Sequence, residues 1–270
     1  MDLKAIHSIP KRIRAQSLGL ILPDSLSSAA LFALAGIRSA GFRDDGRSLL
    51  LKWPVRKPAQ PIHAAQKWWL LTQQSLQVWN LQTTHVDQLQ DDSPPATVKI
   101  ELSDADRSSA LEVLDKHGLK PGQFILLAPT ATGTHRGQIK VWPHFAELAK
   151  RLKSEGFQIA SCPPSHERDQ ARQTCPDAVL LDPLPLKAFC ALSQMAQLVV
   201  CNDSGVSHLA AAAGANQLTL FGVTDPSNTR PLSNHAQLLG SNGKWPDVNQ
   251  VLKKVLASVS DLIETGTCLR

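Results

Sequence analysis

The second half of the chain alternates short apolar runs with segments of helical periodicity, and this alternation constrains the fold more than any other feature. The apolar runs are residues 124–128, 157–160, 179–181, 198–201 and 218–221. Helical segments separate them at residues 145–152, 165–172, 186–195 and 206–213. Uniformly apolar strands that alternate with helices form parallel sheets covered on both faces. We therefore expect a doubly wound α/β domain, whose ligands bind beyond the carboxyl ends of the strands.

The first part of the chain is less regular. Its pattern predicts a basic helix at 8–16, a strand at 18–22 and helices at 27–35 and 62–79. The acidic stretch 87–95 ends in two adjacent prolines and is typical of a loop. A helix ends in the turn sequence His117-Gly-Leu-Lys-Pro-Gly122, and we place the domain join near residue 118. The expected domains are residues 1–118 and 119–270.

Composition excludes several classes of protein. A chain of 270 residues with 43% hydrophobic and 19% charged residues is long enough and apolar enough to build a sizeable core. Its five cysteines are isolated in the sequence and predict neither a disulfide framework nor a zinc site, so a reducing cytosol is the expected compartment. The apolar runs are too short to span a bilayer, and the N-terminus lacks the apolar segment of an export signal.

The charge is unevenly distributed. The net charge is +5, and residues 1–80 hold eleven Lys or Arg against four Asp or Glu. A basic excess of this kind is typical of a solvated surface, or of a surface that meets anionic lipid, an anionic acceptor or nucleic acid. Nucleic acid is the least favoured partner, because no nucleic-acid-binding motif accompanies the charge.

The segment after the strand at 198–201 carries the most informative motif. Asn202-Asp-Ser-Gly205 leads directly into a helix, whose first turn presents unsatisfied N–H groups and a positive dipole end that suit a phosphate. Gly205 allows close approach of the backbone, and His208 follows one turn later as a donor to a phosphate oxygen. The alternative is that Asp203 and Ser204 only cap the helix and that His208 is an ordinary, partly buried histidine.

A second loop between a strand and a helix, residues 128–143, has a similar character. Thr130 and Thr132 supply hydroxyl groups, and Lys140 supplies a positive charge before the Trp-Pro that opens the next helix. The spacing differs from that of a P-loop. The alternative interpretation is a long surface loop with a structural Trp142.

These motifs resemble the lipopolysaccharide heptosyltransferase family, glycosyltransferase family nine. The matching stretches are Lys140-Val-Trp-Pro-His-Phe-Ala-Glu-Leu-Ala149, Asn202-Asp-Ser-Gly-Val-Ser-His-Leu-Ala-Ala211, Leu220-Phe-Gly-Val-Thr-Asp-Pro226 and Thr229-Arg-Pro231. The resemblance implies the glycosyltransferase-B fold, which consists of two Rossmann-like doubly wound domains. It further implies an acceptor-side first domain, here incomplete, and a second domain that binds a nucleotide sugar.

The resemblance also implies an activity, which is inverting transfer of a heptose from an ADP-sugar donor to the anionic lipopolysaccharide inner core. No cofactor or obligatory metal is expected, and the protein would be cytoplasmic, in peripheral contact with the inner membrane. Matched by position, the donor-binding residues are Thr130, Thr132, Lys140, Glu167, Asp203, Ser204, Gly205 and His208. The residues expected to bind the acceptor are the basic Arg43, Arg47, Lys52, Arg56 and Lys57.

The start of the chain departs from the family pattern. Ser17-Leu-Gly-Leu20 has a leucine where the family has its general-base aspartate, and the chain opens at what resembles the helix before the third strand. We therefore expect an N-terminally truncated first domain without this base. Asp24 is the substitute base at a strand end, or else a cap for the next helix. The alternative function is a weak or inactive relative that binds nucleotide sugars; a nucleotide-sugar epimerase fits the loops less well.

Overall fold

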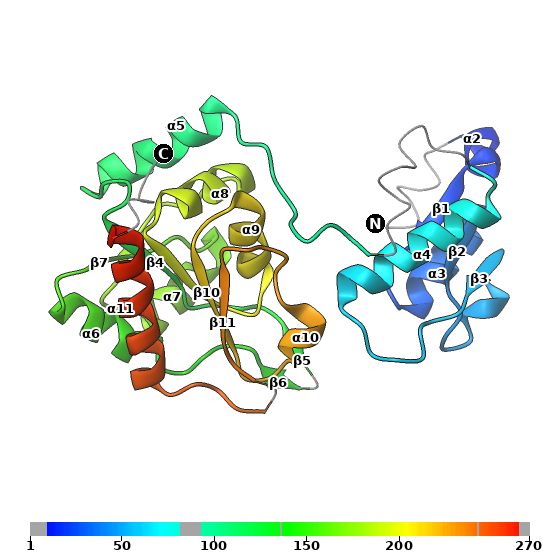
Figure 1. Ribbon diagram of the computed structural model, residues 1–270. Coiled ribbons are helices and arrows are strands. Elements are labelled where there is room, and N and C mark those ends of the chain that lie inside the picture. The colour runs from blue at the N-terminus through cyan, green and yellow to red at the C-terminus, as the bar shows by residue number, and fades with distance from the viewer. Residues whose placement is uncertain (1–9, 82–92, 136, 242, 265–270) are drawn as a thin grey trace. The chain divides into compact units, whose positions relative to one another are not determined.

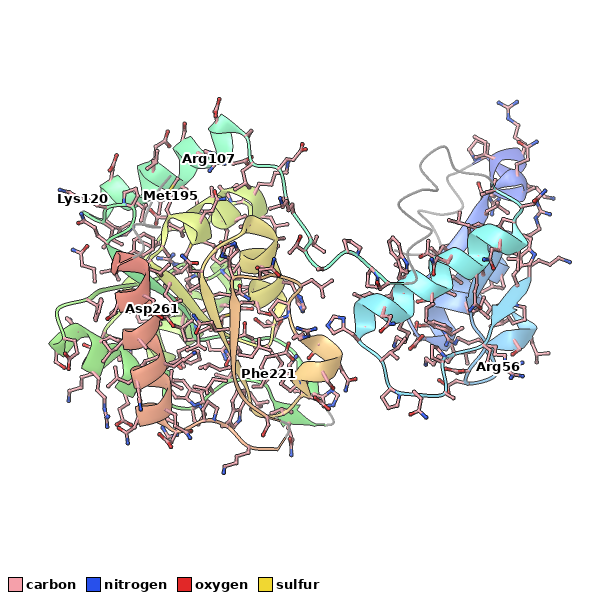
Figure 2. The ribbon with its side chains drawn as sticks, in the orientation of Figure 1. Arg56, Arg107, Lys120, Met195, Phe221 and Asp261 are labelled. Carbon is pink, nitrogen blue, oxygen red and sulfur yellow. The ribbon has the colours of Figure 1, made fainter. Side chains whose placement is uncertain are left out.

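The computed structural model describes residues 10–81, 93–135, 137–241 and 243–264, which divide into two units at Pro94 and Pro95 (Figure 1). The division precedes the join expected near residue 118, because helix α5 (Asp104–Lys116) packs on helix α8 (Leu186–Met195) of the second unit. Figure 2 labels Arg107 on α5 and Met195 on α8, and Arg107 Nη1 donates to Gln194 Oε1 at 2.7 Å. Residues 95–118 therefore belong with the second unit.

A six-stranded parallel sheet forms the centre of the second unit, in the order β11-β10-β9-β4-β7-β8. The strands are β4 (Phe124–Ala128), β7 (Gln158–Ser161), β8 (Val179–Leu180), β9 (Leu198–Asn202), β10 (Gln217–Phe221) and β11 (Ala236–Gly240). The five strands expected from the apolar runs are confirmed to within one or two residues at each end. β11 is an addition that the sequence pattern did not predict.

Helices cover both faces of this sheet (Figure 1). Phe124 and Leu126 pack on the side of α5, α8 and α9 (Gly205–Ala213), whereas Ile125 and Leu127 pack on the side of α6 (Phe145–Ser154) and α11 (Val248–Glu264). The shorter elements are η3 (Ser165–Glu167), α7 (Arg168–Thr174), α10 (Pro226–Thr229) and the hairpin of β5 (Thr134–His135) and β6 (Gln138–Ile139). The doubly wound α/β prediction is confirmed.

The order of the strands reverses between β4 and β9. After β4 the chain continues outward to β7 and β8, and it then returns to place β9 on the other side of β4. Ala128 and Cys201 are paired in the register, so the loops that leave these two strands start side by side. In sheets of this order, such a switch point is where ligands bind.

The first unit contains a parallel three-stranded sheet of order β1-β2-β3. Its elements are α2 (Lys11–Gln16), β1 (Leu18–Ile21), α3 (Leu26–Leu34), β2 (Arg38–Phe42), η1 (Arg47–Leu49), β3 (Trp53–Val55) and α4 (Ala64–Val78). The expected strand and helices are present, although the first helix is described only from residue 10 onward and most of the acidic loop lies outside the described residues. The small residues of β2 give no apolar run, so the sequence did not predict this strand.

Close packing explains why small residues occur in this sheet. A Cβ atom at Gly19 of β1 would lie 2.6 Å from Phe32 Cδ1 on α3. Small clusters around Ile21 on one side and Phe42 on the other form the core of the unit. Among the residues that the structure describes, no helix in either unit is long and apolar enough to cross a bilayer.

Candidate nucleotide-sugar site

A pocket of about 290 Å³ lies beyond the carboxyl ends of β4, β7 and β9, at the switch point of the second unit. Its apolar walls come from the loops after β7 and β8 and from α8 and α9. The apolar residues that line it are Pro163, Pro164, Leu184, Leu186, Phe189, Val206 and Leu209. Its polar walls are Thr130, Thr132, Glu167, Ser204 and Gly205. A largely apolar slot with polar groups at one end suits a nucleoside that carries phosphate.

The N-terminus of α9 forms part of the polar wall. Ser204 precedes the helix in an extended conformation, and its side chain makes no capping hydrogen bond. Ser204 Oγ is buried and has no hydrogen-bond partner in the part of the chain that the structure describes. A Cβ atom at Gly205 would meet no atom within 4 Å, so the backbone here faces open space. The first N–H groups of α9 are therefore available to an anion, and Ser204 Oγ is a buried donor beside them.

Asp203 lies under this helix end rather than in the pocket wall. It is 3% exposed, and its Oδ2 atom lies 3.0 Å from Lys140 Nζ. The same Oδ2 atom accepts hydrogen bonds from Thr224 Oγ1 at 2.5 Å and Thr229 Oγ1 at 3.2 Å. Asp203 therefore does not cap α9. The ion pair with Asp203 holds the Lys140 ammonium close to Ser204, the residue that precedes α9.

Asn202 ties the two loops of the switch point together. Its Oδ1 atom accepts the backbone N–H of Trp142 at 2.9 Å, and its Nδ2 atom donates to the Ala128 carbonyl oxygen at 3.3 Å. Trp142 is fully buried and donates from Nε1 to the Pro246 carbonyl oxygen at 2.8 Å. The structural role considered for Trp142 is confirmed, whereas the sequence did not predict the role of Asn202. An asparagine directly after an apolar strand was the available signal.

Glu167 and Thr130 meet on one side of the pocket. Thr130 Oγ1 donates to Glu167 Oε2 at 2.5 Å, and both residues line the cavity. Cys162 lines the same wall, where burial raises the pKa of its thiol to about 12. The thiol is therefore neutral at physiological pH, and Glu167 is the group on this wall that can accept hydrogen bonds from a ligand hydroxyl.

His208 is not among the α9 residues that line the pocket. Val206 and Leu209 are three residues apart, share a helix face and line the pocket. His208 is exposed and is not part of the described pocket wall. Thr132, in contrast, is exposed and lines the pocket. Of the eight donor residues expected from the sequence, five line the cavity and Lys140 and Asp203 form the ion pair beside it.

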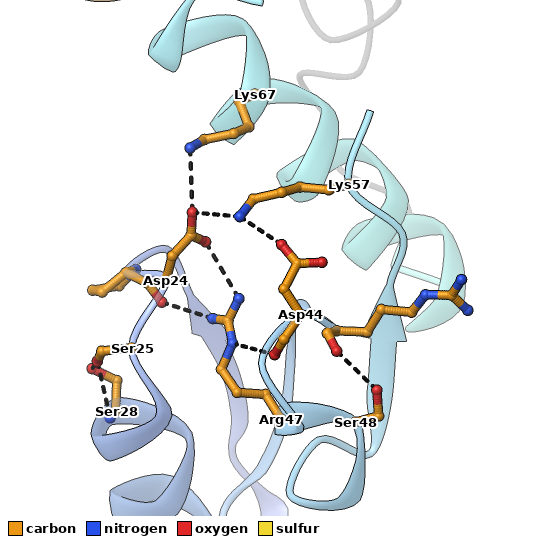
Figure 3. A network of polar contacts seen from close by, with 10 residues as sticks. Asp24, Ser25, Ser28, Asp44, Arg47, Ser48, Lys57 and Lys67 are labelled. Atoms are coloured by element: carbon orange, nitrogen blue, oxygen red, sulfur yellow. Dashed lines mark hydrogen bonds and ion pairs between the residues drawn. The ribbon is translucent and has the colours of Figure 1, made fainter. Parts of the chain in front are cut away.

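In the first unit, Asp24 occupies the centre of a charged network (Figure 3). Its Oδ2 atom lies 2.9 Å from Lys57 Nζ and 3.3 Å from Lys67 Nζ, and its Oδ1 atom lies 3.5 Å from Arg47 Nη2. Burial raises the pKa of Asp24, but the hydrogen bond from Lys57 and the charges of Lys67 and Lys57 outweigh it, so the pKa lies below its usual value. A carboxylate with a lowered pKa is a weaker general base at neutral pH.

The cap of α3 comes from the residue after Asp24. Ser25 Oγ accepts the backbone N–H of Ser28, so the alternative interpretation of Asp24 as the helix cap is wrong. The Asp24 carboxylate follows β1 and instead contacts Arg47 after β2 and Lys57 after β3, so it links the loops that follow the three strands. Arg47 strengthens this link because it also donates to the carbonyl oxygens of Pro23 and Asp44.

The five basic residues expected to bind an acceptor separate into two groups. Arg47 is fully buried, and Lys57 is partly buried between Asp24 and Asp44. The other three side chains are exposed, and they are Arg43, Lys52 and Arg56. Arg47 and Lys57 stabilise the loops, so the three exposed residues are the ones that a ligand could contact. No cluster of metal-ligating side chains occurs among the described residues.

Comparison with solved structures identifies the class of fold to which this chain belongs. The structure titled E. coli ADP-heptose lps heptosyltransferase II matches with a TM-score of 0.68 at 22% identity, over 96% of this chain and 80% of that chain. The E. coli heptosyltransferase WaaC with ADP matches with a TM-score of 0.62 at 20% identity, over 94% and 78% of the two chains. The expected glycosyltransferase-B fold is confirmed.

The sequence comparison is more specific. The family described as glycosyltransferase family 9 (heptosyltransferase) matches residues 6–257. Lipooligosaccharide heptosyltransferase 2 of Haemophilus influenzae is 25% identical over 251 residues, which cover 88% of this chain and 70% of that protein. The chain belongs to glycosyltransferase family 9, the heptosyltransferase family, and it is a glycosyltransferase.

Proposed function

We propose that the protein transfers a heptose, with inversion, from an ADP-sugar to the anionic inner core of lipopolysaccharide. The observation that carries the proposal is the helix end at Gly205, where Ser204 and Gly205 line a pocket of about 290 Å³ at the switch point and the backbone faces open space. The relatives named above are an ADP-heptose heptosyltransferase and a heptosyltransferase with ADP. The membership in family 9 supports the same donor for this chain.

The walls of the pocket suggest how the donor lies. The adenosine would fill the apolar slot, with the carboxylate of Glu167 accepting hydrogen bonds from ribose hydroxyls. The diphosphate would then reach the end of α9, where Ser204 and the backbone N–H groups donate to it. Lys140 lies beside this end of the helix and supplies the positive charge.

The reaction would be a single displacement at the anomeric carbon of the sugar. The acceptor hydroxyl forms the new C–O bond as the bond to the diphosphate breaks, and ADP leaves with the bonding electrons. Negative charge grows on the leaving phosphate, which the donors of Ser204, α9 and Lys140 stabilise. The hydroxyl proton passes to a base, and Asp24 is the candidate that follows a strand end of the first unit.

A second candidate function is nucleotide-sugar binding with feeble transfer. The observation that favours it is the lowered pKa of Asp24 within its three cations. Loss of general-base help reduces a rate by about 10²–10⁴-fold. Calorimetry with ADP, run beside a transfer assay with an ADP-heptose donor and a deacylated core acceptor, separates the two functions. Binding without transfer supports the second candidate, and absence of both rejects the donor site.

Ser204→Ala is expected to weaken ADP binding by about tenfold or more, because a hydrogen bond to a charged group contributes about 1.5–3 kcal/mol. Isothermal titration calorimetry measures the change. The matched control is Ser109→Ala, which removes an exposed serine hydroxyl on α5. Equal ADP affinity in all three proteins would contradict the placement of the diphosphate at α9.

We also propose peripheral contact with the cytoplasmic face of an anionic inner membrane through a patch made of Arg43, Leu49 and Arg56. Arg43 N donates to the Val55 carbonyl oxygen at 2.9 Å, and Ser48 Oγ donates to the Arg43 carbonyl oxygen at 3.0 Å. These bonds bring together the stretches of chain that carry the three side chains. Leu49 is 94% exposed, and Figure 2 labels Arg56 in the segment after β3. An exposed leucine together with exposed arginines suits an anionic lipid surface.

The double variant Arg43→Ala/Arg56→Ala is expected to bind phosphatidylglycerol vesicles about 25-fold more weakly, because each basic residue near such a surface is worth about 1 kcal/mol. Vesicle co-sedimentation of the full chain measures this change, with phosphatidylcholine vesicles as the neutral reference. Lys11→Ala/Arg12→Ala on α2 removes the same charge from another exposed site and serves as the control. Equal losses in both double variants would show that only net charge matters and would reject the patch.

A further inference from the structure

The carboxylate of Asp203 has more donors than an ion pair with Lys140 requires. Three groups donate to its Oδ2 atom, and only Lys140 among them is charged. Thr224 lies in the loop after β10, and Thr229 ends α10. Both threonines belong to the Leu220-to-Pro231 region that the sequence analysis singled out and that the proposed donor site does not use. Two hydroxyl donors, one from the loop after β10 and one from α10, therefore converge on one oxygen.

The two partners of the ion pair differ in their access to a ligand. The side chain of Asp203 is 4% exposed, whereas that of Lys140 is 21% exposed and belongs to the loop after β4. Lys140 is therefore the partner that an anion can approach, and Asp203 remains buried. While Lys140 is paired with Asp203, the two charges cancel, which weakens the attraction of this lysine for a phosphate.

Moving Lys140 from Asp203 to a phosphate would leave a buried carboxylate without its cation. A buried charge that loses its partner is costly unless other donors satisfy it. Thr224 and Thr229 already donate to the oxygen that Lys140 contacts, so Asp203 would retain two hydrogen bonds after the lysine leaves. The hydroxyls lower the cost of releasing Lys140.

We propose that Thr224 and Thr229 are positioning residues that allow Lys140 to exchange Asp203 for the diphosphate of the donor. This inference rests on the proposed donor site and adds to it a release step controlled by residues that do not line the described pocket. The exchange breaks no covalent bond. The ammonium group of Lys140 turns from one acceptor to another, and the two threonines hold Asp203 in place.

Thr224→Val tests the release step because valine keeps the approximate shape of threonine and removes the hydroxyl donor. We expect ADP to bind about tenfold more weakly, since the remaining Asp203 carboxylate holds Lys140 more tightly. Thr224→Ser restores the donor and should restore the affinity to within about twofold. Calorimetry of the full chain with ADP gives the affinities, and thermal melting shows whether each variant is folded. Thr229→Val provides a second variant if Thr224→Val does not fold.

The double variant Thr224→Val/Asp203→Asn distinguishes positioning from a structural role. Neutralising Asp203 removes the charge that holds Lys140, so ADP affinity should return toward that of the unmodified chain. If Thr224→Val weakens binding and Asp203→Asn does not rescue it, the threonine is merely structural and the inference is overturned. Unchanged affinity in folded Thr224→Val and Thr229→Val overturns it as well. Failure of the unmodified chain to bind ADP would instead reject the donor site, and the inference with it.

Discussion

Trp142→Ala is expected to lower the free energy of unfolding of the second unit by about 3–5 kcal/mol, the range measured when large aromatic side chains are removed from protein cores. Trp142 is 0% exposed, and its ring packs edge-on against Phe145 with centroids 5.3 Å apart. Its loss would leave a cavity between α6 and the sheet and an unpaired carbonyl oxygen at Pro246. Chemical denaturation followed by circular dichroism measures the change.

The control for this prediction is Trp68→Ala, which removes the same side chain from α4 of the first unit, where it is 44% exposed. We expect its effect to stay below about 1.5 kcal/mol, because much of the ring already contacts solvent. A loss in Trp142→Ala no larger than that in Trp68→Ala would show that the loop of residues 129–144 does not depend on the tryptophan.

Lys140→Met is expected to reduce kcat/KM for sugar transfer roughly 100- to 1,000-fold, the usual cost of removing one group that stabilises developing charge. Methionine retains an unbranched apolar side chain but has no ammonium group. Thr224 and Thr229 continue to donate to Asp203, so the second unit should remain folded. Steady-state kinetics with a saturating acceptor and a varied donor concentration measure the loss.

Lys150→Met changes an exposed lysine of α6 in the same way and is expected to leave kcat/KM within about twofold. The comparison separates a local effect of Lys140 from the loss of one positive charge on the domain. If Lys140→Met retained full activity, Lys140 would be a partner of Asp203 alone, and the charge opposite the diphosphate would have to come from elsewhere.

The sequence predicted the second unit well, because buried parallel strands carry a strong signal. The expected and observed bounds of β4 and α8 coincide at residues 124–128 and 186–195. The first unit is harder to predict. β2 has the sequence Arg-Ser-Ala-Gly-Phe, and its residues after Arg38 are buried because α3 and the neighbouring strands approach closely. Small residues selected by tertiary contact give no local apolar pattern.

The site was only partly predictable for a similar reason. Ser204 and Gly205 follow a buried strand directly, so their place at the helix end could be inferred from local sequence. The contact between Asp203 and Thr224 joins residues 21 positions apart, and it exists because β9 and β10 are neighbours in the sheet. A helical segment alone does not show which of its residues line the pocket, and His208 of α9 is not among them.

Three consecutive residues, the last of β9 and the two that follow it, have three different roles. Asn202 binds the Trp142 backbone, Asp203 holds Lys140, and Ser204 opens toward the pocket. The three residues are contiguous, so one inserted or deleted residue here would displace all three side chains at once. At this point of the chain the number of residues therefore matters as much as their chemistry.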